Sequence, residues 1–572
     1  MSRPPAAATP SAPTRLGRLT ATERRVWQAF ARGETVDLRT GDAALDDPAA
    51  ADRWTADRAV RGEVIAALLL GGGPAEVGSV AAVRLTGALI TGDLAVDHGQ
   101  LSPVLALRAC RFEGALVLDG ASAESVDLRG SRLPLLSAFG ARIQGTLDLR
   151  DTVITGRGGR AVHAENVVVE AGLLANRAVL HGTLGLIHAQ IGGQLTLIDT
   201  QLLGPDAATP SLNAGGIRIG RSLLAMRLVA TGEVRLPGAH IGSSLLLTGA
   251  TLDGLGGPAL HAPSLAVSSE ASFAPNSGGP DTRRFTAAGT VRLSGARFGR
   301  GLDLSGALFS PCPGEPALLA SRMTVEDNLR IGAGMRADGE IELTGVRIAG
   351  YLDLRAMACP DALLTLAAAS AAGGIQEDAR SWPGRLDLDG FSYGTFDRYA
   401  DASARLPLLR RQVRHTERHR VGAYRAQPYA QLADHYRRLG NDGEARTVLL
   451  TRQRVLRGKL SRPRRIPGYL LDLLVGYGYR PLRAIGWALG LLAVSSAYFD
   501  RVRPQRVSSE DTSVFNPVLY AADHLIPIIR FGQSEVWQYH GVPAVVSAVL
   551  TVLGWTLGIA IAAAATRTFN RN

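Results

Sequence analysis

The chain has 572 residues, of which 46% are hydrophobic, only 5% are aromatic and 66 are glycine. So few aromatic residues among so many glycines argue against one large globular core and favour narrow, repeated coils. The three cysteines, Cys110, Cys312 and Cys359, are scattered without a CxxC pair, which argues against a disulfide framework or a zinc site. The net charge is +11.

The first 75 residues predict a tail and a helical cap. Residues 1–19 are rich in Ala, Pro, Ser and Thr, which predicts a disordered tail. Thr20 and Glu23 have the spacing of a capping box and predict a helix that runs to about Arg32. A second helix is predicted from Trp54 to Leu70, so we expect residues 20–75 to cover the start of the next domain.

Residues 76–396 repeat the pattern L-x-L-x-G-A-x-I-x-G, and neighbouring copies lie about 11 residues apart. The alternation predicts short strands with leucine inward and Asp, Arg and Thr outward. Eleven residues are too few for a strand and a helix, so two units of about 22 residues in all predict one turn of a right-handed parallel β-helix. Glycine at the corners would permit positive φ. The copies include VRLTGALITG (83–92), LDLRDTVITG (147–156), VRLPGAHIGS (234–243) and IELTGVRIAG (341–350).

Four stretches depart from this pattern: residues 157–183, 204–216, 254–289 and 310–328. Most are rich in Gly, Pro or Ser, and we expect them to leave the solenoid as loops and candidate functional surfaces. Aspartates recur within the repeat, and their alternation predicts a solvated ladder on the outside rather than paired catalytic carboxylates. They are Asp119, Asp148, Asp303, Asp353, Asp387 and Asp389.

Residues 397–465 predict a basic helical connector that covers the last turn of the solenoid. Its segment from Pro428 to Leu449 is similar to one tetratricopeptide unit. One unit cannot form a peptide-binding groove, so we expect a structural connector, with docking of a protein partner as the alternative. His415 and His419 lie four residues apart, but the HExxH pattern of a zinc enzyme is missing and arginines surround them.

Residues 466–572 predict a membrane domain with two spans. The 24 residues from Val542 to Ala565 carry no charge, and a spanning helix needs about 20. The first span is predicted at about residues 482–499, where Arg483 can reach the headgroups. Residues 500–541 form the loop between the spans, and Leu470 to Val475 predicts a helix in the membrane interface.

Arginine predicts the orientation in the membrane. From Arg405 to Arg483 the chain has 19 Lys+Arg against 5 Asp+Glu, whereas the loop between the spans is mixed. The positive-inside rule therefore puts both termini and the β-helix in the cytoplasm of a multi-pass plasma-membrane protein. Several arginines are expected to set this topology and to attract anionic lipid headgroups. They are Arg462, Arg464, Arg465, Arg483 and Arg567. Nucleic-acid binding is not expected, because aromatic residues do not alternate with the charges.

Small residues predict how the spans pack. Gly486 and Gly490 form a GxxxG pair in the first span, and Gly554 and Gly558 form one in the second. Such pairs let helices approach closely, either within the chain or in a homo-oligomer. The loop carries a motif with a helix cap and an apolar face. We expect this segment either to lie on the outer leaflet or to re-enter the membrane. The motif residues are Asn516, Pro517, Tyr520, Asp523 and Pro527.

No motif in the sequence predicts a catalytic, cofactor or metal site. The nearest match to a dinucleotide-binding turn is Gly332-Ala-Gly334, but a repeat strand follows it instead of a helix. The only lysine, Lys459, lies outside any phosphate-binding loop. We therefore expect no cofactor and lean against an enzyme.

Over nearly its whole length, and most specifically from Gln427 onward, the chain resembles a family of actinobacterial two-span membrane proteins with an N-terminal quasi-repeat β-helix. The resemblance lies in Gln427 to Gly440, in Tyr477 to Ala484 and in Phe515 to Tyr520 with Asp523, Leu525, Pro527, Ile528, Phe531, Gly532 and Gln533. Members often carry the label "membrane-associated oxidoreductase", which implies such an activity here. The repeat part is also similar to pentapeptide-repeat and bactofilin solenoids, which are scaffolds.

Three functions follow as hypotheses. The leading one is a membrane-anchored cytoplasmic β-helix scaffold that interacts with a protein partner, because no catalytic motif is found. The first alternative is a subunit of an oligomeric channel-like or sensor protein, because two spans and an apolar loop resemble the plan of small channels. The second is the oxidoreductase that the family label implies.

Overall fold

The computed structural model describes residues 16–71, 73, 75–101, 103–276, 282–378, 381–413, 424–478, 482–502, 504–507, 514–526 and 529–569. The chain divides into two compact units, and each is described by itself. The first is Met1–Tyr399 with Arg410–Ala423, and the second is Ala400–Leu409 with Tyr424–Asn572. His415 and His419 lie outside the described residues.

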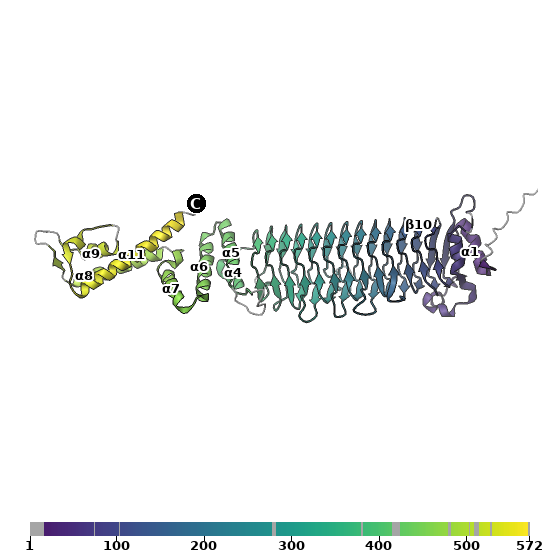
Figure 1. Ribbon diagram of the computed structural model, residues 1–572, viewed down its shortest axis with the longest axis horizontal. Coiled ribbons are helices and arrows are strands. Elements are labelled where there is room, and N and C mark those ends of the chain that lie inside the picture. The colour runs from purple at the N-terminus through teal and green to yellow at the C-terminus, as the bar shows by residue number, and fades with distance from the viewer. Residues whose placement is uncertain are drawn as a thin grey trace, which may run out of the picture. The chain divides into compact units, whose positions relative to one another are not determined.

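The first unit is a parallel β-solenoid of about 13 turns, seen in Figure 1 as stacked arrows. Four sheets, named A to D here, run along it, and each strand pairs with strands one turn before and after. Sheet A runs from β1 (Thr35–Asp37) to β50 (Gly374–Gln376), and sheet B from β2 (Ala59–Arg61) to β44 (Arg336–Ala337). Sheet C runs from β5 (Leu94–Ala95) to β51 (Arg385–Asp387), and sheet D from β6 (Gln100–Leu101) to β52 (Ser392–Tyr393).

One turn shows how the repeat folds. It contains β11 (Val126–Asp127), β12 (Arg132–Leu133), β13 (Leu136–Ser137) and β14 (Arg142–Ile143), one strand from each sheet. In each strand the apolar residue is buried and stacks on its counterparts in the next turns. Two neighbouring repeat units begin at Val234 and Leu245. Val234 of β29 (Val234–Arg235) lies in sheet C, where it pairs with Leu212, whereas Leu245 of β31 (Leu245–Leu246) lies in sheet A. Two repeat units therefore make one turn, which confirms the predicted parallel β-helix.

The corners after sheets A and C need a residue with positive φ. Glycine supplies it at many corners, as at Gly238 with φ of 63°. Other corners use a residue with a side chain, such as His98, Asn166 and Ala368, with φ of 55°, 59° and 53°. The left-handed conformation costs such residues about 1–2 kcal/mol each, which the surrounding stack of strands offsets.

Those corners explain a wrong prediction. Two of the four segments expected to leave the solenoid, residues 157–183 and 254–289, contain strands of all four sheets and so keep much of its regular path, whereas most of residues 204–216 and the first part of residues 310–328 do leave it. Residues 157–183 carry β17 (Arg160–His163), β18 (Val168–Val169), β19 (Gly172–Leu174) and β20 (Val179–His181). The glycine-based pattern missed these turns because Asn166 and Arg177 take the corner positions. Between sheets B and C, short excursions occur at residues 155–159, 204–211, 254–259 and 311–317.

The aspartates of the repeat point outward but are not simply solvated. Asp148 and Asp387 are 7% and 3% exposed. Asp148 accepts from Arg150 Nη2 at 2.6 Å and lies 3.4 Å from Arg129, which also pairs with Asp127. Ion pairs to arginines of the same or the next turn therefore tie successive turns together, and the prediction of a solvated ladder was wrong for this part.

The N-terminal cap begins with α1 (Ala21–Arg32), and its Thr20–Glu23 capping box is confirmed. Leu16 is buried, and its carbonyl accepts from Arg61. The predicted second helix is only half right. After α2 (Ala43–Asp46), η2 (Pro48–Arg53) and η3 (Ala56–Arg58), the chain forms β2 and only then α3 (Gly62–Leu69). Val60 of β2 pairs with Ile90 of β4 (Leu89–Thr91), so β2 is the first strand of sheet B. At the other end Gln412 bridges Leu386.

The second unit is helical. Its α5 (Ala426–Arg438) and α6 (Asp442–Lys459) form the expected hairpin, with α4 (Ala402–Leu409) beside α6. Then follow α7 (Arg462–Val475), η4 (Gly476–Gly478), α8 (Leu482–Arg501), α9 (Pro517–Leu525), α10 (Gln533–Val536) and α11 (Val542–Phe569). The pair β53 (Gln505–Arg506) and β54 (Trp537–Gln538) is antiparallel. Among the described residues one helix, α11, is long and apolar enough to cross a membrane, over Val542–Ile559. The first span stays a prediction.

Candidate functional site

The segment between α8 and α11 has an aromatic core of its own. Phe499 of α8, Tyr520 of α9 and Tyr539 are buried against one another, with ring centroids 5.0–5.3 Å apart. The Tyr539 hydroxyl donates to the Phe499 and Val502 carbonyls at 3.1 and 2.9 Å. The part of this segment that the structure describes is therefore packed rather than an open loop.

The predicted loop motif supplies local anchors. The Asn516 side chain accepts from the amides of Val518 and Leu519 at 3.0 and 3.2 Å, and Pro517 opens α9. Asp523 accepts from three backbone amides, those of Phe531, Gln533 and Ser534. Pro527 lies outside the described residues. The motif therefore holds α9 and the chain around α10 in place, which is a structural role for three of its residues.

The predicted small-residue faces do not meet. A Cβ added to Gly554 would lie 2.4 Å from the Leu525 carbonyl oxygen, so α9 crosses α11 closely there. A Cβ added to Gly486, Gly490 or Gly558 would have no described atom within 4 Å, leaving aside the backbone of its own helix. The helices α8 and α11 instead meet through Ala484 and Leu557. Packing of the two GxxxG pairs on each other within the chain is therefore not observed.

Basic and apolar side chains share α7. Arg462 and Arg464 are exposed at its start, while Arg465 donates to the Leu460 and Gly458 carbonyls at the end of α6. Ile466, Tyr469, Leu471 and Leu473 are exposed along the same helix. Arg483 is exposed at the start of α8, and Arg567 lies in the last turns of α11. An exposed basic end beside exposed apolar residues suits a membrane interface.

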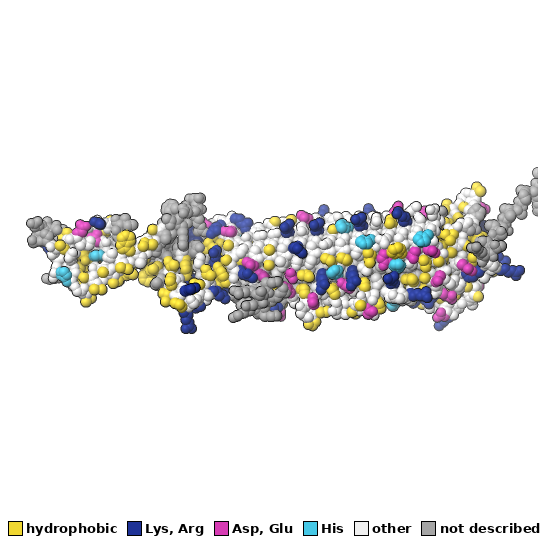
Figure 2. Space-filling view, viewed as in Figure 1, with side chains coloured by type: hydrophobic (Ala, Val, Ile, Leu, Met, Phe, Trp, Pro, Cys, Tyr) yellow, Lys and Arg dark blue, Asp and Glu magenta, His cyan; other side chains and the backbone are white. Residues whose placement is uncertain are grey.

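The helix α11 exposes apolar residues along its predicted span. Val545, Val552 and Ile559 are each more than 60% exposed, and only 22% of Val542–Ile559 is buried. Figure 2 shows apolar side chains on the surface of the helical unit. Exposure of this apolar surface to water is unfavourable, whereas its contact with the hydrocarbon of a lipid bilayer is not.

A polar cluster on sheet C resembles a catalytic triad in composition. Ser137 Oγ donates to Asp119 Oδ1 at 2.6 Å and lies 3.2 Å from His163 Nδ1. His163 Nε2 lies 3.0 Å from Glu165 Oε2, and the Phe139 ring stacks on the imidazole at 5.4 Å. The Ser137 proton is already held by a carboxylate, and the residue is 6% exposed. This arrangement fastens neighbouring turns rather than presenting a nucleophile.

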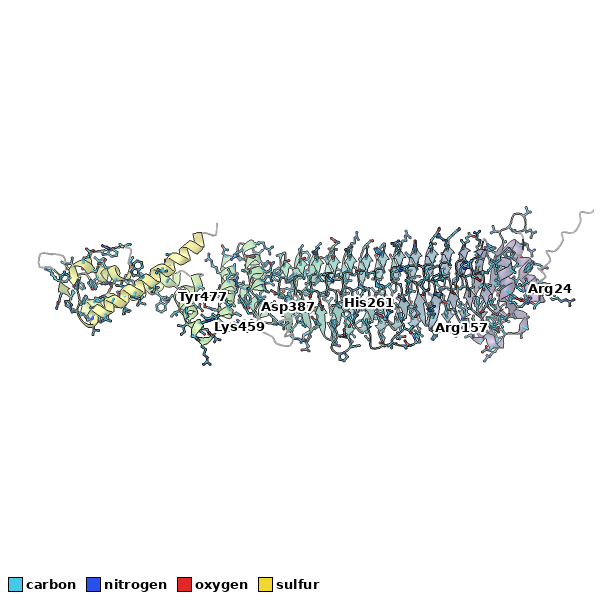
Figure 3. The ribbon with its side chains drawn as sticks, viewed as in Figure 1. Arg24, Arg157, His261, Asp387, Lys459 and Tyr477 are labelled. Carbon is cyan, nitrogen blue, oxygen red and sulfur yellow. The ribbon has the colours of Figure 1, made fainter. Side chains whose placement is uncertain are left out.

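Basic residues also occupy one position of sheet C in successive turns. Arg235, His261 and Arg292 occupy the same position in three successive turns, and Figure 3 marks His261 on the solenoid. Burial lowers the pKa of His261, the nearby Glu233 raises it, and the two arginines lower it further, so that it lies below its ordinary value. The imidazole is therefore neutral at pH 7, and the row carries fewer charges than its sequence suggests.

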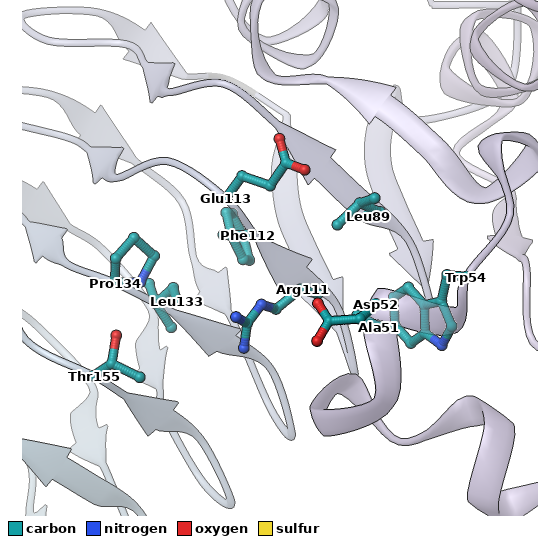
Figure 4. Close-up of a pocket in the computed structure, with 10 residues that line it drawn as sticks. All are labelled: Ala51, Asp52, Trp54, Leu89, Arg111, Phe112, Glu113, Leu133, Pro134 and Thr155. Atoms are coloured by element: carbon teal, nitrogen blue, oxygen red, sulfur yellow. The ribbon is translucent and has the colours of Figure 1, made fainter.

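A hollow of about 330 Å³ lies between the cap and sheet B (Figure 4). The cap contributes Ala51, Asp52 and Trp54, and the strands contribute Arg111, Glu113 and Pro134 with Leu89, Phe112, Leu133 and Thr155. The Trp54 indole is fixed, because Nε1 donates to the Leu45 carbonyl at 2.6 Å and the Arg58 guanidinium lies 4.7 Å from the ring centroid. Sequence reasoning missed this hollow because Trp54 was assigned to a helix.

Within the described ranges, no group of three or more His, Cys, Asp or Glu side chains is placed to hold a metal ion. Burial raises the pKa of the Cys110 thiol to about 12. Cys359 is also buried, and its thiol pKa is raised for the same reason. Cys312 is half-buried and lines a hollow of about 460 Å³ at the Pro311–Pro316 loop.

Comparison with known proteins found no matching family model, no matching curated protein and no matching solved structure. The resemblance to the actinobacterial family therefore stays an expectation from the sequence.

Proposed function

We propose that the protein is a membrane-anchored scaffold whose β-solenoid presents interaction surfaces on the cytoplasmic side. The observation that carries the proposal is α11, which exposes apolar residues over a length sufficient to span a bilayer. A long solenoid supports the scaffold half of the proposal, since such folds offer extended surfaces for partners. No observation on the described residues supports the oxidoreductase activity that the resemblance implies, and it is not part of the proposal.

The basic end of α7 supports contact with anionic lipid. Arg462 and Arg464 are exposed, and each arginine near an anionic surface contributes about 1 kcal/mol. Replacing both by glutamine should weaken binding of anionic lipid, added to the full chain in neutral detergent, by about 30-fold, with little change in the binding of neutral lipid. Arg218→Gln together with Arg297→Gln is the matched control, because both arginines are exposed on sheet D of the solenoid.

Extraction of membranes tests the anchor itself. The full chain should stay in the membrane pellet at alkaline pH and dissolve only in detergent. A variant with Val549→Arg and Val552→Arg, in the middle of α11, should be released to a larger extent than the full chain, because each central arginine costs about 2.5–3.5 kcal/mol in a spanning helix and only the predicted first span is left intact. Release of the full chain by alkali alone would refute an integral anchor.

An oligomeric channel-like or sensor protein is the second candidate. It is favoured by Gly486, Gly490 and Gly558, whose faces have no neighbour within the described chain and can receive a second copy. The test is the subunit count of the full chain in mild detergent by light scattering. A closed ring of four or more subunits would support a pore, whereas a monomer or dimer would leave the scaffold.

A further inference from the structure

The outer face of sheet A carries an apolar patch in the middle of the solenoid. Its side chains come from four successive turns, lie on the strands or at the corners after them, and are half-buried. They are Leu174, Ile198, Leu224, Met226 and Leu246. Strand pairing puts Leu224 of β27 (Leu223–Leu224) next to Leu246 in the following turn. The patch is therefore continuous along the solenoid axis.

Charges of opposite excess flank this patch on the same face. On the N-terminal side, from β3 (Ala82–Thr86) to β15 (Thr146–Asp148), arginines outnumber carboxylates: Arg84, Arg108, Arg129 and Arg150 against Asp127 and Asp148. On the C-terminal side, from β35 (Ala271–Ser272) to β50, carboxylates outnumber arginines: Glu270, Asp303, Asp353 and Asp378 against Arg330 and Arg355. The face is therefore positive at one end, apolar in the middle and negative at the other.

The negative side also has a hollow of about 330 Å³, which begins at Leu246 and extends across β35 to β39 (Leu302–Asp303) and β43 (Leu329–Arg330). Ser272 takes the position that Leu246 has in the preceding turn, so a small side chain replaces a large one there. Glu270 is exposed and Asp303 is half-buried, and both line the hollow. A long basic side chain fits such a space and such charges.

The positive side supplies side chains of this kind. Arg150 is held in place, because its Nη2 donates to Asp148 at 2.6 Å, and its side chain remains 35% exposed. Arg129 is 37% exposed and is held by Asp127 at 2.8 Å. A surface that carries both a patch and a matching pair of charged ends is complementary to itself, which is the requirement for a two-fold dimer.

We propose that sheet A binds a second copy of the chain, with the two solenoids antiparallel and the two apolar patches in contact. The two-fold axis runs along the strands between β23 (Leu195–Thr196) and β27. β15 of one copy then faces β35 of the other, because each is the third strand from the axis. Arg150 and Arg129 of each copy enter the hollow of the other, beside Glu270 and Asp303.

Charge decides between the two possible directions. Parallel solenoids would put the positive end of one copy on the positive end of the other, whereas antiparallel solenoids pair opposite charges. The area fits a weak dimer. The 12 strands from β3 to β47 (Tyr351–Asp353) extend about 58 Å at about 4.8 Å per strand, and a face about 10 Å wide gives about 600 Å² per copy. We therefore expect dissociation in the micromolar range.

Self-association of the full chain in mild detergent tests the proposal, with the mass measured by analytical ultracentrifugation over a concentration series. Leu224→Arg should weaken association at least tenfold, since each dimer would bury the new charge twice in the apolar patch. Val229→Arg is the matched control. Val229 is half-buried on the outer face of sheet B in the same turn, in β28 (Val229–Thr231), and its substitution should leave association unchanged.

A charge exchange tests the antiparallel direction. Arg150→Glu and Glu270→Arg should each weaken association about tenfold, because each change affects two contacts per dimer. The two substitutions together in one chain should restore association to within about threefold, since residue 150 of each copy meets residue 270 of the other.

Cross-linking gives the direction independently of affinity. In a Cys312→Ser background, one variant carries Thr146→Cys in β15 and another carries Ser272→Cys in β35, both at half-buried outer positions. A short bifunctional maleimide should join the two variants when they are mixed, and it should join neither variant to itself.

Four results would overturn the proposal. One is a full chain that stays monomeric up to about 100 μM. Another is association that Leu224→Arg and Val229→Arg affect equally, which would place the contact outside sheet A. The others are no recovery in the charge exchange, and cross-linking of either cysteine variant to itself. The inference does not rest on the membrane anchor, because membrane retention and self-association are separate measurements.

Discussion

Two glycines at solenoid corners should respond differently to the same substitution. A Cβ at Gly220 would lie 2.1 Å from the carbonyl oxygen of Gly192 in the preceding turn, so the backbone itself must move. Gly238 has room for a Cβ, with no described atom within 4 Å, but its φ is 63°. Alanine therefore meets a steric obstacle at one position and a conformational one at the other.

The expected costs follow from these two causes. Gly220→Ala overpacks the corner and should cost about 2–3 kcal/mol, whereas Gly238→Ala should cost about 1 kcal/mol, because alanine already adopts such a φ at Ala368. Local opening should therefore speed up about 30- to 150-fold near Gly220 and about fivefold near Gly238.

Amide hydrogen exchange of the full chain measures both effects. The reporters are the amide of Gly220, which donates to the Ile191 carbonyl at 2.7 Å, and that of His240, which donates to Ile217 at 2.8 Å. Equal acceleration in the two variants, or none at Gly220→Ala, would refute the reasoning that the corner of successive turns is closed to a side chain.

Three further predictions concern charge and burial. Partial burial raises the pKa of Asp127, but hydrogen bonds from Arg129 and Arg108 outweigh this effect and leave the pKa below its ordinary value. The ionised carboxylate therefore stabilises the fold above about pH 4. This contribution is lost as the pH falls through the pKa of the folded state. Arg129→Gln should accordingly flatten the loss of stability in acid, measured by urea unfolding at about pH 2 to 5. One of the three cysteines, Cys312, should react with a thiol reagent in the native protein at pH 8 and all three in denaturant, since Cys110 and Cys359 are buried with raised pKa values; native labelling of all three would contradict the packed core. Asp523→Asn should speed up exchange of the Phe531, Gln533 and Ser534 amides at least about tenfold, because hydrogen bonds to a charged acceptor contribute about 1.5–3 kcal/mol. Unchanged exchange there would refute the anchoring role.

The sequence predicted the strands correctly wherever a repeat unit kept the leucine alternation and the corner glycine. Leucine alternation predicted the strands and their inward residues, because the period of two is fixed by the backbone. It failed at corners such as Asn166, where tertiary packing holds a non-glycine residue at positive φ. It also failed at Val60, whose strand exists only because β4 offers an edge, a long-range cause that a local pattern does not carry.

In the candidate sites too, local features were predictable from the sequence and long-range contacts were not. Asn516 and Pro517 were recognisable as a helix start, since capping chemistry is local. The three amides gathered by Asp523 and the hollow between Trp54 and Pro134 join residues distant in sequence, and only the folded chain brings them together. The two GxxxG pairs were recognisable as small-residue faces, but spacing alone cannot say which helix, if any, packs against them.

The central claim is tested most directly by labelling cysteines from outside intact cells with a membrane-impermeant maleimide. In a Cys312→Ser background, one variant carries Glu535→Cys between α8 and α11, and the other carries Glu170→Cys on the solenoid; both positions are exposed. A scaffold anchored by two spans predicts that the first is labelled in intact cells and the second only after permeabilisation. Equal labelling of both in intact cells, or of neither before permeabilisation, would contradict a cytoplasmic solenoid held by a two-span anchor.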